Sequence, residues 1–338
     1  MSAAAPFPSV TVVIVAYDSG GYLQPCLDAL ASQSFTDFEA VVADNASQDA
    51  SVVELRMPDA RFTLREMGAN LGFAAANNRV AEDSRAEFLA LLNPDATPEP
   101  GWLAALVEAA GAHPQAASFG SVQLRMEEPH ILDGVGDVWH VAGLAWRAGE
   151  GWAATRAPGD GEIFAPCGAA ALYRLKLFLE AGGFDERFFC YCEDLDLGHR
   201  LRAMGAGSRR VAKAVVRHAG SGISGRTSDF TMFHGHRNRI WTFVKNTPGP
   251  WFWWLLPYHV AFNLLYLGSA VRRRVFRPVW RSYVAAVRGL KPFLADRRAL
   301  GRSRRTPFAL EVMASTPWSP FRRELHPRCP SDPHRTIG

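Results

Sequence analysis

The first 110 residues alternate between short apolar runs and stretches with helical spacing, and this alternation constrains the fold more than any other feature. The runs are rich in β-branched residues and end in polar, turn-forming residues; the predicted strands are residues 10–17, 38–43, 61–65 and 87–92. The predicted helices are a pattern over residues 23–30, residues 72–83, and a segment with apolar residues on one face over residues 102–107. Strand–helix alternation is typical of a parallel, doubly wound sheet, in which ligands bind beyond the carboxyl ends of the strands. We therefore expect an α/β fold with a ligand site at that edge.

The pattern changes after this region. Residues 116–173 contain Gly-rich turns and aromatic segments around three tryptophans, which predict a mixed or antiparallel extension. Periodic segments then predict helices at residues 174–181, 193–204 and 230–245, with a strand at residues 209–217.

Composition and charge exclude several classes of protein. A chain of 338 residues with 48% hydrophobic and 21% charged residues and no repeats is not disordered, collagenous or a coiled coil. The net charge of +4 is unevenly distributed, because residues 1–244 carry −9 and residues 245–338 carry +13. A basic segment of this kind usually meets an anionic surface, either nucleic acid or a membrane.

The five cysteines and the N-terminus bear on the compartment. Cys190 and Cys192 are spaced too tightly for the usual zinc motif, and an odd cysteine count suits a reducing compartment. The N-terminus has no basic region, and its apolar run is too short for a signal peptide. We expect the body of the protein to lie in the cytoplasm.

The C-terminal quarter begins at a Pro/Gly-rich boundary, residues 246–250. Residues 251–271 follow without a charge, which is long enough to cross a bilayer, although one proline, one histidine and one asparagine weigh against crossing. Residues 275–287 then repeat apolar side chains at helical spacing, with arginines on another face. Three interpretations remain open: a spanning helix, attachment to an anionic membrane surface, or a soluble helical cap. Nucleic acid is disfavoured because the aromatic residues form a continuous apolar face.

Four motifs occur in an informative order. They are the strand ending at Tyr17 with Asp44-Asn45-Ala46-Ser47, then Asn70-Leu71-Gly72-Phe73 with Asn77, then Asn93-Pro94-Asp95, and finally Glu193-Asp194-Leu195-Asp196 followed by His218. In this order they resemble the inverting family 2 glycosyltransferases of the GT-A fold, in particular the bacterial rhamnosyltransferase-like subgroup. The resemblance covers about residues 9–245.

The resemblance implies a domain organisation. It predicts a GT-A-type doubly wound, mostly parallel sheet with a mixed acceptor-side extension. The composition after residue 245 predicts that a C-terminal helical membrane-associated segment follows. We divide residues 1–245 into a nucleotide-binding half (9–110) and an acceptor half (111–245). Residues 246–300 form the apolar and basic helical segment, and residues 301–338 an irregular basic tail.

The resemblance also implies a nucleotide-sugar site at the strand ends. Asp44 would accept a hydrogen bond from the pyrimidine ring, although an Asp in this place is also a common helix cap and Asp49 is the better pure cap. Gly72 would allow the ligand to approach the backbone closely. The alternative is that this segment is an ordinary turn before a helix. The full set of donor-site candidates is Ala16, Tyr17, Asp18, Asp44, Asn70, Gly72, Asn77 and Asn93.

By the same resemblance, Asp95 occupies the end of the family's metal-binding Asp-x-Asp, and His218 is a second ligand. Asn93 departs from the two-carboxylate form, which suggests looser binding of Mg²⁺ or Mn²⁺ and is usual in the rhamnosyltransferase-like subgroup. A divalent ion would stabilise the charge on the departing nucleoside diphosphate. The alternatives are a turn Asp and a structural His.

Asp194 is the predicted catalytic base, with Glu193 as its rival. An inverting transfer needs one carboxylate to take the proton of the acceptor hydroxyl. Both acids open a predicted helix, and repulsion among them and Asp196 would raise the pKa of one. The alternative is an acidic first helical turn that leaves Asp196 and His199 exposed.

Gly168 lies in a small-residue segment that would border the acceptor cleft, unless this is an ordinary core strand. Arg237 and Arg239 would hold a diphosphate or the phosphate of a lipid-linked acceptor, against the alternative of a solvated basic face. The Gln-x-x-Arg-Trp signature of processive synthases is absent, which predicts a single addition.

Together these features predict a metal-assisted glycosyltransferase at the cytoplasmic face of the plasma membrane. The implied partners are a dTDP- or UDP-linked sugar, with dTDP-rhamnose preferred over a UDP-hexose or UDP-furanose, and a saccharide or polyprenyl-diphosphate-linked acceptor. We expect no nucleic-acid partner. A nicotinamide-dependent oxidoreductase would need Gly-x-Gly-x-x-Gly after the first strand, where Asp18 and Ser19 stand instead. A non-catalytic scaffold would not need to keep Asp44, Asp95 and Asp194 together.

Overall fold

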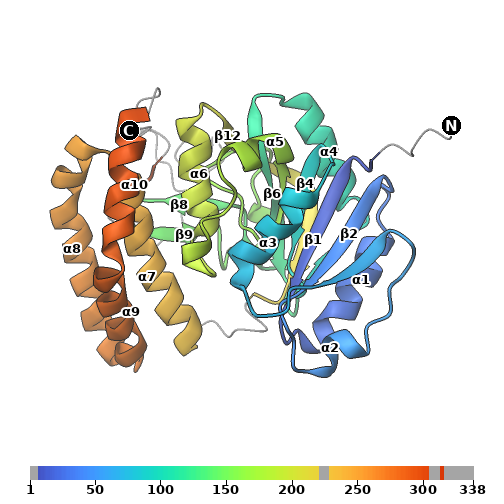
Figure 1. Ribbon diagram of the computed structural model, residues 1–338, viewed down its shortest axis with the longest axis horizontal. Helices are drawn as coiled ribbons and strands as arrows, with labels where there is room; N and C mark the ends of the chain where they lie inside the picture. Colours follow the sequence, from blue (N-terminus) through green and yellow to red (C-terminus); the bar gives the residue numbers. More distant parts are fainter. Residues whose placement is uncertain (1–6, 221–227, 304–312, 316–338) are drawn as a thin grey trace.

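The computed structural model describes residues 7–220, 228–303 and 313–315, and its centre is a mixed ten-stranded sheet with helices on both faces (Figure 1). The main path of the sheet runs β10 (Gly161–Ile163), β12 (Gly207–His218), β6 (Ala116–Arg125), β11 (Ala170–Arg174), β4 (Phe88–Leu92), β1 (Val10–Ala16), β2 (Phe38–Asp44) and β3 (Phe62–Glu66). Two further strands pair at its side: β5 (Ala96–Pro98) with β12, and β7 (Leu132–Gly134) with β6.

The N-terminal half of the sheet is parallel, as the strand–helix alternation predicts. β3, β2, β1 and β4 run in the same direction, and the register pairs Ala16 with Asp44 at their carboxyl ends. β11 then runs antiparallel to both β4 and β6. β6 and β12 pair parallel and run in the same direction as β4, so β11 and β10 are the two strands of the main path that oppose the others. The sheet is therefore mixed, but its main path is mostly parallel, as expected.

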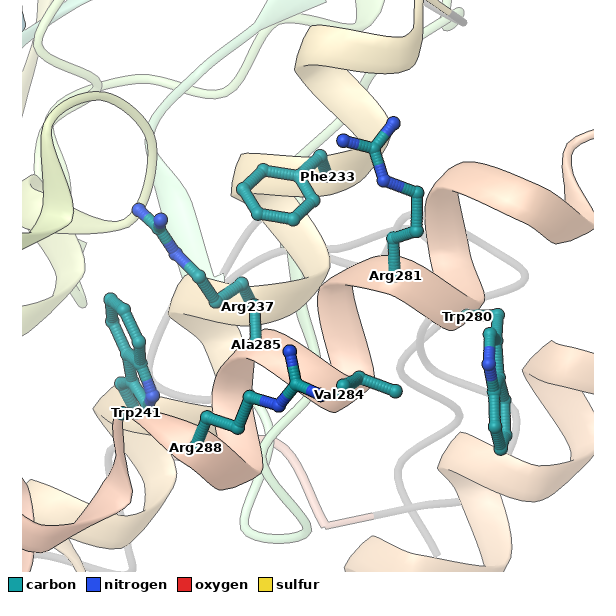
Figure 2. A pocket seen from close by; sticks show the side chains of 9 residues that line it. Phe233, Arg237, Trp241, Trp280, Arg281, Val284, Ala285 and Arg288 are labelled. Atoms are coloured by element: carbon teal, nitrogen blue, oxygen red, sulfur yellow. The ribbon is translucent and has the colours of Figure 1, made fainter.

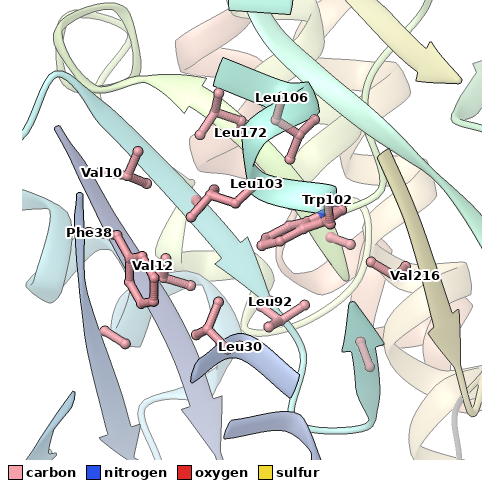
Figure 3. Close-up of a cluster of buried hydrophobic side chains, with 14 of the residues drawn as sticks. Val10, Val12, Leu30, Phe38, Leu92, Trp102, Leu103, Leu106, Leu172 and Val216 are labelled. Atoms are coloured by element: carbon pink, nitrogen blue, oxygen red, sulfur yellow. The ribbon is translucent and has the colours of Figure 1, made fainter. Parts of the chain in front are cut away.

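Both faces of the sheet are covered, because alternate residues of β1 enter different buried clusters. Val10, Val12 and Ile14 join α1 (Leu23–Ala31) and α4 (Trp102–Ala112) in one cluster, part of which Figure 3 shows. On the other face Val13 packs with three helices: α3 (Gly72–Asp83), α5 (Leu175–Glu180) and α6 (Glu193–Ala203). Shorter helical turns are η1 (Gly20–Tyr22), α2 (Ala50–Val53), η2 (Ala154–Arg156) and η3 (Glu186–Phe188).

A small two-stranded sheet stands beside the main one, made of β8 (Asp137–Trp139) and β9 (Ala145–Arg147). It holds two of the three tryptophans that predicted an antiparallel extension, whereas Trp152 lies outside any strand. The extension is therefore confirmed, but its strands are only three residues long.

Four C-terminal helices form a layer at one end of the molecule (Figure 1). They are α7 (Asp229–Asn246), α8 (Gly249–Arg272), α9 (Phe276–Arg288) and α10 (Leu290–Ser303). Pro257 lies inside α8 without ending it, and Pro278 stands in the first turn of α9, where a missing N–H does no harm. None of the helices in the described ranges is both long and apolar enough to cross a membrane.

The C-terminal helices share a hydrophobic cluster with the rest of the protein. Trp241 of α7 stacks on Phe293 of α10, with ring centroids 4.6 Å apart, and its indole N–H donates to the Ala286 carbonyl of α9 at 2.9 Å. Phe188, which precedes α6, belongs to the same cluster. The segment after residue 245 is thus packed against the body.

Candidate active site

A cavity of about 650 Å³ opens beyond the carboxyl end of β4, and the loop before α6, α7 and α8 contribute to its lining. Five of the residues predicted from the sequence line it: Asn93, Gly168, Glu193, Asp194 and Arg239. Its lining also contains charged residues that sequence analysis missed, namely Asp133, Asp137, Arg147, Glu150 and Arg273. The other predicted residues lie outside this lining: Ala16, Tyr17, Asp18, Asp44, Asn70, Gly72, Asn77, Asp95, His218 and Arg237.

Asp194 lies in the first turn of α6 and is held by two backbone N–H groups. Gly168 donates to its carboxylate at 3.2 Å and Leu195 at 2.7 Å. The backbone just before α6 adopts left-handed φ angles at Tyr191 (73°) and Cys192 (66°). Such conformations cost about 1–3 kcal/mol each and are kept where the surroundings hold them. Here they carry the chain from the loop into the helix, with the two acids at the cavity wall.

The three acids at the start of α6 have different environments. Burial, and then the charge of Asp194, raise the pKa of Glu193 well above its usual value. Burial also raises the pKa of Asp194, although the two N–H donors partly oppose it. Asp196 is buried as well, but Arg200 and Lys245 outweigh burial and lower its pKa. The expected pKa rise thus falls on the two acids in the cavity, and Asp196 is not the exposed residue that the helix-cap alternative requires.

A second buried acid faces Asp194. Oxygen atoms of Asp137 and Asp194 and the sulfur of Cys167 lie within 4.8 Å of one another. Burial and the charge of Asp194 raise the pKa of Asp137 well above its usual value, and burial raises the pKa of the Cys167 thiol to about 12. This trio is a possible metal-ligating group, but a protonated thiol suits Mg²⁺ or Mn²⁺ poorly because both prefer oxygen ligands. Arg147 donates to the Cys167 sulfur at 3.0 Å and pairs with Asp133.

Asp95 and His218 lie together behind the cavity, where Asp133 joins them. The His218 Nε2 is 3.2 Å from the Asp95 carboxylate, and its Nδ1 is 2.8 Å from Asp133. All three side chains are almost completely buried. Burial opposes protonation of His218, but its hydrogen bonds to Asp133 and Asp95 raise its pKa overall.

The strand ends of β1 and β2 hold Asp18 and Asp44 in local hydrogen bonds. The Asp18 carboxylate accepts from the Gln48 N–H at 2.6 Å, and Asp18 itself has a φ of 46°. The Asp44 carboxylate accepts from the N–H and hydroxyl of Ser47 at 3.0 and 2.6 Å. Tyr17, beside them, is 40% exposed. Asp49 caps α2, because its side chain accepts a hydrogen bond from the Ser51 N–H. This agrees with the prediction that Asp49 is a better helix cap than Asp44.

Gly72 opens α3 with a φ of +80°, and a Cβ there would approach within 2.5 Å of the Phe189 ring. Only glycine fits this close approach. Asn70 accepts a hydrogen bond from the Gly72 N–H at 3.0 Å. Asn77 is fully buried and donates to the Phe73 carbonyl at 2.8 Å, so in this arrangement it supports α3 and has no surface for a ligand.

Arg237 and Arg239 lie on different faces of α7, so the structure does not bring them together. Arg239 lines the active-site cavity and donates to the Asn263 side chain of α8 at 2.5 Å. Arg237 donates to the Phe188 carbonyl at 3.0 Å and lines a separate cavity between α7 and α9 (Figure 2). Of the two arginines predicted to hold a diphosphate or an acceptor phosphate, Arg239 lies at the active-site cavity and Arg237 does not.

Comparison with known families identifies the fold and the class of activity. The family model of glycosyl transferase family 2 matches residues 11–181, which is half of the chain and reaches from β1 to α5. The chain belongs to glycosyl transferase family 2, and the protein is a glycosyltransferase that uses a nucleotide-sugar donor.

Relatives with assigned names are consistent with this family. The N-acetylglucosaminyl-diphospho-decaprenol L-rhamnosyltransferase of Mycobacterium tuberculosis is 29% identical over 271 residues, which cover 73% of this chain and 86% of that protein. The O-antigen biosynthesis protein RfbC of Myxococcus xanthus is 28% identical over 210 residues, which cover 59% of this chain and 16% of that protein.

Solved structures support the GT-A-like fold. The mannosyltransferase PcManGT from Pyrobaculum calidifontis, solved with GDP-Man and Mn²⁺, has a TM-score of 0.51 at 18% identity and covers 89% of both chains. GalNAc-T7, solved with UDP, GalNAc and Mn²⁺, has a TM-score of 0.56 at 14% identity over 71% of this chain and 48% of its own.

Proposed function

We propose that the protein transfers one sugar, with inversion, from a nucleoside-diphosphate donor to a lipid-linked saccharide, and that Asp194 is the catalytic base. The observation that carries the proposal is the position of Asp194 in the cavity wall, beside Gly168 and beyond the strand ends. A carboxylate there can take the proton of an acceptor hydroxyl as that oxygen attacks the anomeric carbon.

Asp194 is better suited to this role than Glu193. The Glu193 side chain is 4% exposed, and its Oε2 has no hydrogen-bond partner among the described residues. Burial and the charge of Asp194 raise the pKa of Glu193 well above its usual value, which favours the protonated form over the ionised form that a base needs. Two N–H donors favour the ionised form of Asp194, while burial keeps it a usable base.

We propose dTDP-rhamnose as the donor and a polyprenyl-diphosphate-linked saccharide as the acceptor. The rhamnosyltransferase name of the Mycobacterium tuberculosis relative supports both choices. A UDP-hexose or UDP-furanose is the alternative donor, because the strand-end residues Asp18 and Asp44 do not reveal which sugar hydroxyls are read. Arg239 and Arg273 give the cavity positive charge that suits a diphosphate.

A divalent metal fits the residues that the sequence assigns to it. The facing oxygen of Asp95 and nitrogen of His218 are 3.2 Å apart, a separation compatible with two ligands on one ion, and Mg²⁺ and Mn²⁺ accept such atoms. When bound, the ion would stabilise the charge on the departing nucleoside diphosphate. Asp133 would orient the His218 ring through Nδ1, as a carboxylate commonly does behind a ligating histidine.

We also propose attachment to the cytoplasmic face of the plasma membrane through α8 and α9. Large apolar side chains of α8 are exposed to solvent, among them Trp253 (67%), Trp254 (76%) and Leu265 (70%). α9 adds exposed arginines next to this apolar surface. Exposed aromatic residues combined with basic charge favour binding to an anionic membrane surface.

The test of the donor proposal is thermal stabilisation of the full chain by dTDP, UDP, GDP and NAD, each with and without Mn²⁺. A ligand at 100 times its dissociation constant adds about 2.7 kcal/mol, so binding is readily measured. We expect a metal-dependent shift with dTDP or UDP, and the larger of the two identifies the donor nucleotide. A shift with NAD alone, or none with a pyrimidine diphosphate, would overturn the proposal.

A further inference from the structure

A second cavity, of about 540 Å³, lies between α7 and α9 and is lined by cationic and aromatic side chains. Figure 2 shows the three arginines around it, with Arg237 coming from α7 and Arg281 and Arg288 from α9. Its aromatic lining consists of Phe233, Trp241 and Trp280. We call this space the arginine cavity. It shares no described lining residue with the active-site cavity.

The arginine cavity carries positive charge without a counter-ion. Within the described chain, none of its three arginines forms an ion pair, and its lining contains no acid. Arg237 is partly buried, and burial lowers its pKa to about 10. Its charge is instead surrounded by neutral groups, the Phe188 carbonyl and the His234 ring. An uncompensated, partly desolvated cation favours an anionic ligand.

Aromatic rings orient these guanidinium groups and extend the arginine cavity to the surface. The Arg237 guanidinium lies 4.4 Å from the Trp241 ring centroid, and that of Arg281 lies 5.9 Å from the Phe233 centroid. At the rim, Trp280 is 51% exposed and stacks parallel to Phe276, which is 42% exposed. A ligand that carries its negative charge at the end of an apolar chain would match both the cationic lining and the aromatic rim of the arginine cavity.

We propose that the arginine cavity binds the phosphate of an anionic phospholipid, whose acyl chains lie along the exposed aromatic residues of α9. Arginine matches phosphate oxygens with paired N–H donors, which the exposed Arg281 and Arg288 can supply. Arg237 adds positive charge, although its Nε and Nη2 already donate to protein groups. The occupant is a bilayer lipid and not the lipid-linked acceptor, because the acceptor must reach Asp194 in the other cavity. This inference rests on the proposed attachment to the membrane and assigns it a defined site.

The test is flotation of the full chain with vesicles of phosphatidylcholine alone or mixed with phosphatidylglycerol. The variant is Arg281→Gln with Arg288→Gln, since both side chains are exposed and both line the arginine cavity. The charge-matched control is Arg277→Gln with Arg298→Gln, two exposed arginines of α9 and α10 outside the arginine cavity. General attraction alone changes binding about fivefold for each arginine, and would affect both variants equally.

We expect the cavity variant to lose about tenfold more binding to phosphatidylglycerol vesicles than the control, and to keep that difference in high salt, which screens surface charge first. Equal losses would overturn the inference. Soluble glycerol phosphate, tested by thermal stabilisation, separates the sources of phosphate. If it stabilises the wild type but not the cavity variant while both variants float equally, the site takes free phosphate and the lipid assignment is wrong.

Two readouts separate this inference from the proposed function. Stabilisation by dTDP or UDP with Mn²⁺ is measured on the same proteins, and its absence would count against the donor proposal alone. Absence of any wild-type binding to phosphatidylglycerol vesicles would contradict both the membrane attachment and the arginine cavity as a lipid site.

Discussion

At the scale of single residues, Asp194 combines two influences that a general base requires. Burial disfavours its charge, whereas the N–H groups of Gly168 and Leu195 favour it. Asp137 faces it: burial, the charge of Asp194 and a hydrogen bond between the two carboxyl groups raise the pKa of Asp137, and the same hydrogen bond favours the ionised form of Asp194. A base with a raised pKa that remains ionised is matched to proton transfer near neutral pH.

Replacing Asp194 tests the base directly. Asp194→Asn keeps the size of the side chain but removes the proton acceptor, so turnover should fall by about 10²–10⁴. Donor binding, measured by thermal stabilisation with nucleotide and Mn²⁺, should be retained. Glu180→Gln on α5 is the control, because Glu180 is exposed and does not line the cavity. Wild-type turnover in the Asp194 variant would rule out the assignment.

Asp133 is the acid on which the charges behind the cavity depend. It is 1% exposed and contacts both His218 and Arg147. Asp133→Asn would leave Arg147 and the buried His218 ring without their carboxylate partner, so the free energy of unfolding should fall by about 3 kcal/mol in urea denaturation. Glu128→Gln breaks an exposed ion pair with Arg125 and should cost at most about 1 kcal/mol. Similar costs for the two variants would contradict this account of the buried charges.

The residues that sequence reasoning found are those attached to regular elements. Asp44, Asp95 and Asp194 follow strands or open a helix, where the apolar pattern indicates their place. Asp133 and Asp137 were missed because they lie in strands of three residues, too short for alternation to be visible. A signal was present: both acids interrupt an apolar, Gly-rich run four residues apart.

At the scale of elements, α8 is fixed to the body by a neutral histidine. His259 stacks on Phe243 with ring centroids 4.0 Å apart, and its Nδ1 lies 2.8 Å from the Ala142 carbonyl. Its Nε2 lies 3.1 Å from the Asn263 amide nitrogen. These contacts suit a ring that donates through Nδ1 and accepts through Nε2, which is the neutral form.

The stability of this contact should depend on pH. Burial lowers the pKa of His259 to about 4, below its unfolded value of 6.5. The unfolded state therefore binds a proton first as the pH falls, and the free energy of unfolding should decrease between pH 6.5 and 4, by up to about 3 kcal/mol from this group. His259→Gln should flatten that decrease in urea denaturation at several pH values. Exposed His130→Gln is the control, and an unchanged slope in the His259 variant would refute the prediction.

Element positions were predictable where periodicity is long. The helix at residues 72–83 and the strands of the N-terminal half follow directly from apolar spacing. The predicted domain boundary at residue 300 falls inside α10. The apolar face of α10 is weak, and its partner Trp241 lies about 50 residues earlier in the chain. Long-range packing of this kind leaves no local pattern.

At the scale of the whole molecule, the C-terminal helices and the catalytic body depend on one another. Lys245 of α7 forms ion pairs with Asp185 and with Asp196 of α6, at 2.8 and 2.9 Å. Ion pairs therefore join α7 to the body in addition to the hydrophobic contacts. Trp241 and Phe243 are buried beneath α8, α9 and α10. The sequence suggests a boundary near residue 245, but packing crosses it.

A chain that ends at Lys245 should therefore be much less stable than the full chain. It would expose Trp241 and Phe243, and burial of each such side chain is worth about 1.5–3 kcal/mol. We expect a lower melting temperature and binding of a hydrophobic dye. A chain that ends at Ser315 keeps α8–α10 together with Met313 and Ala314, which are buried in the same clusters, and should melt at a higher temperature than the Lys245 chain. Equal melting of the Lys245 chain would show that the layer is dispensable.

Helix α7 has one face in each cavity, since Arg239 points to the active site and Arg237 to the arginine cavity two residues away. If a lipid phosphate occupies the latter, α7 acts as a rigid spacer, and the distance from the bilayer surface to Asp194 is set by the width of one helix. The enzyme would then select acceptors by the distance between their hydroxyl group and the bilayer surface. The end of a glycan that is one sugar longer would lie beyond Asp194.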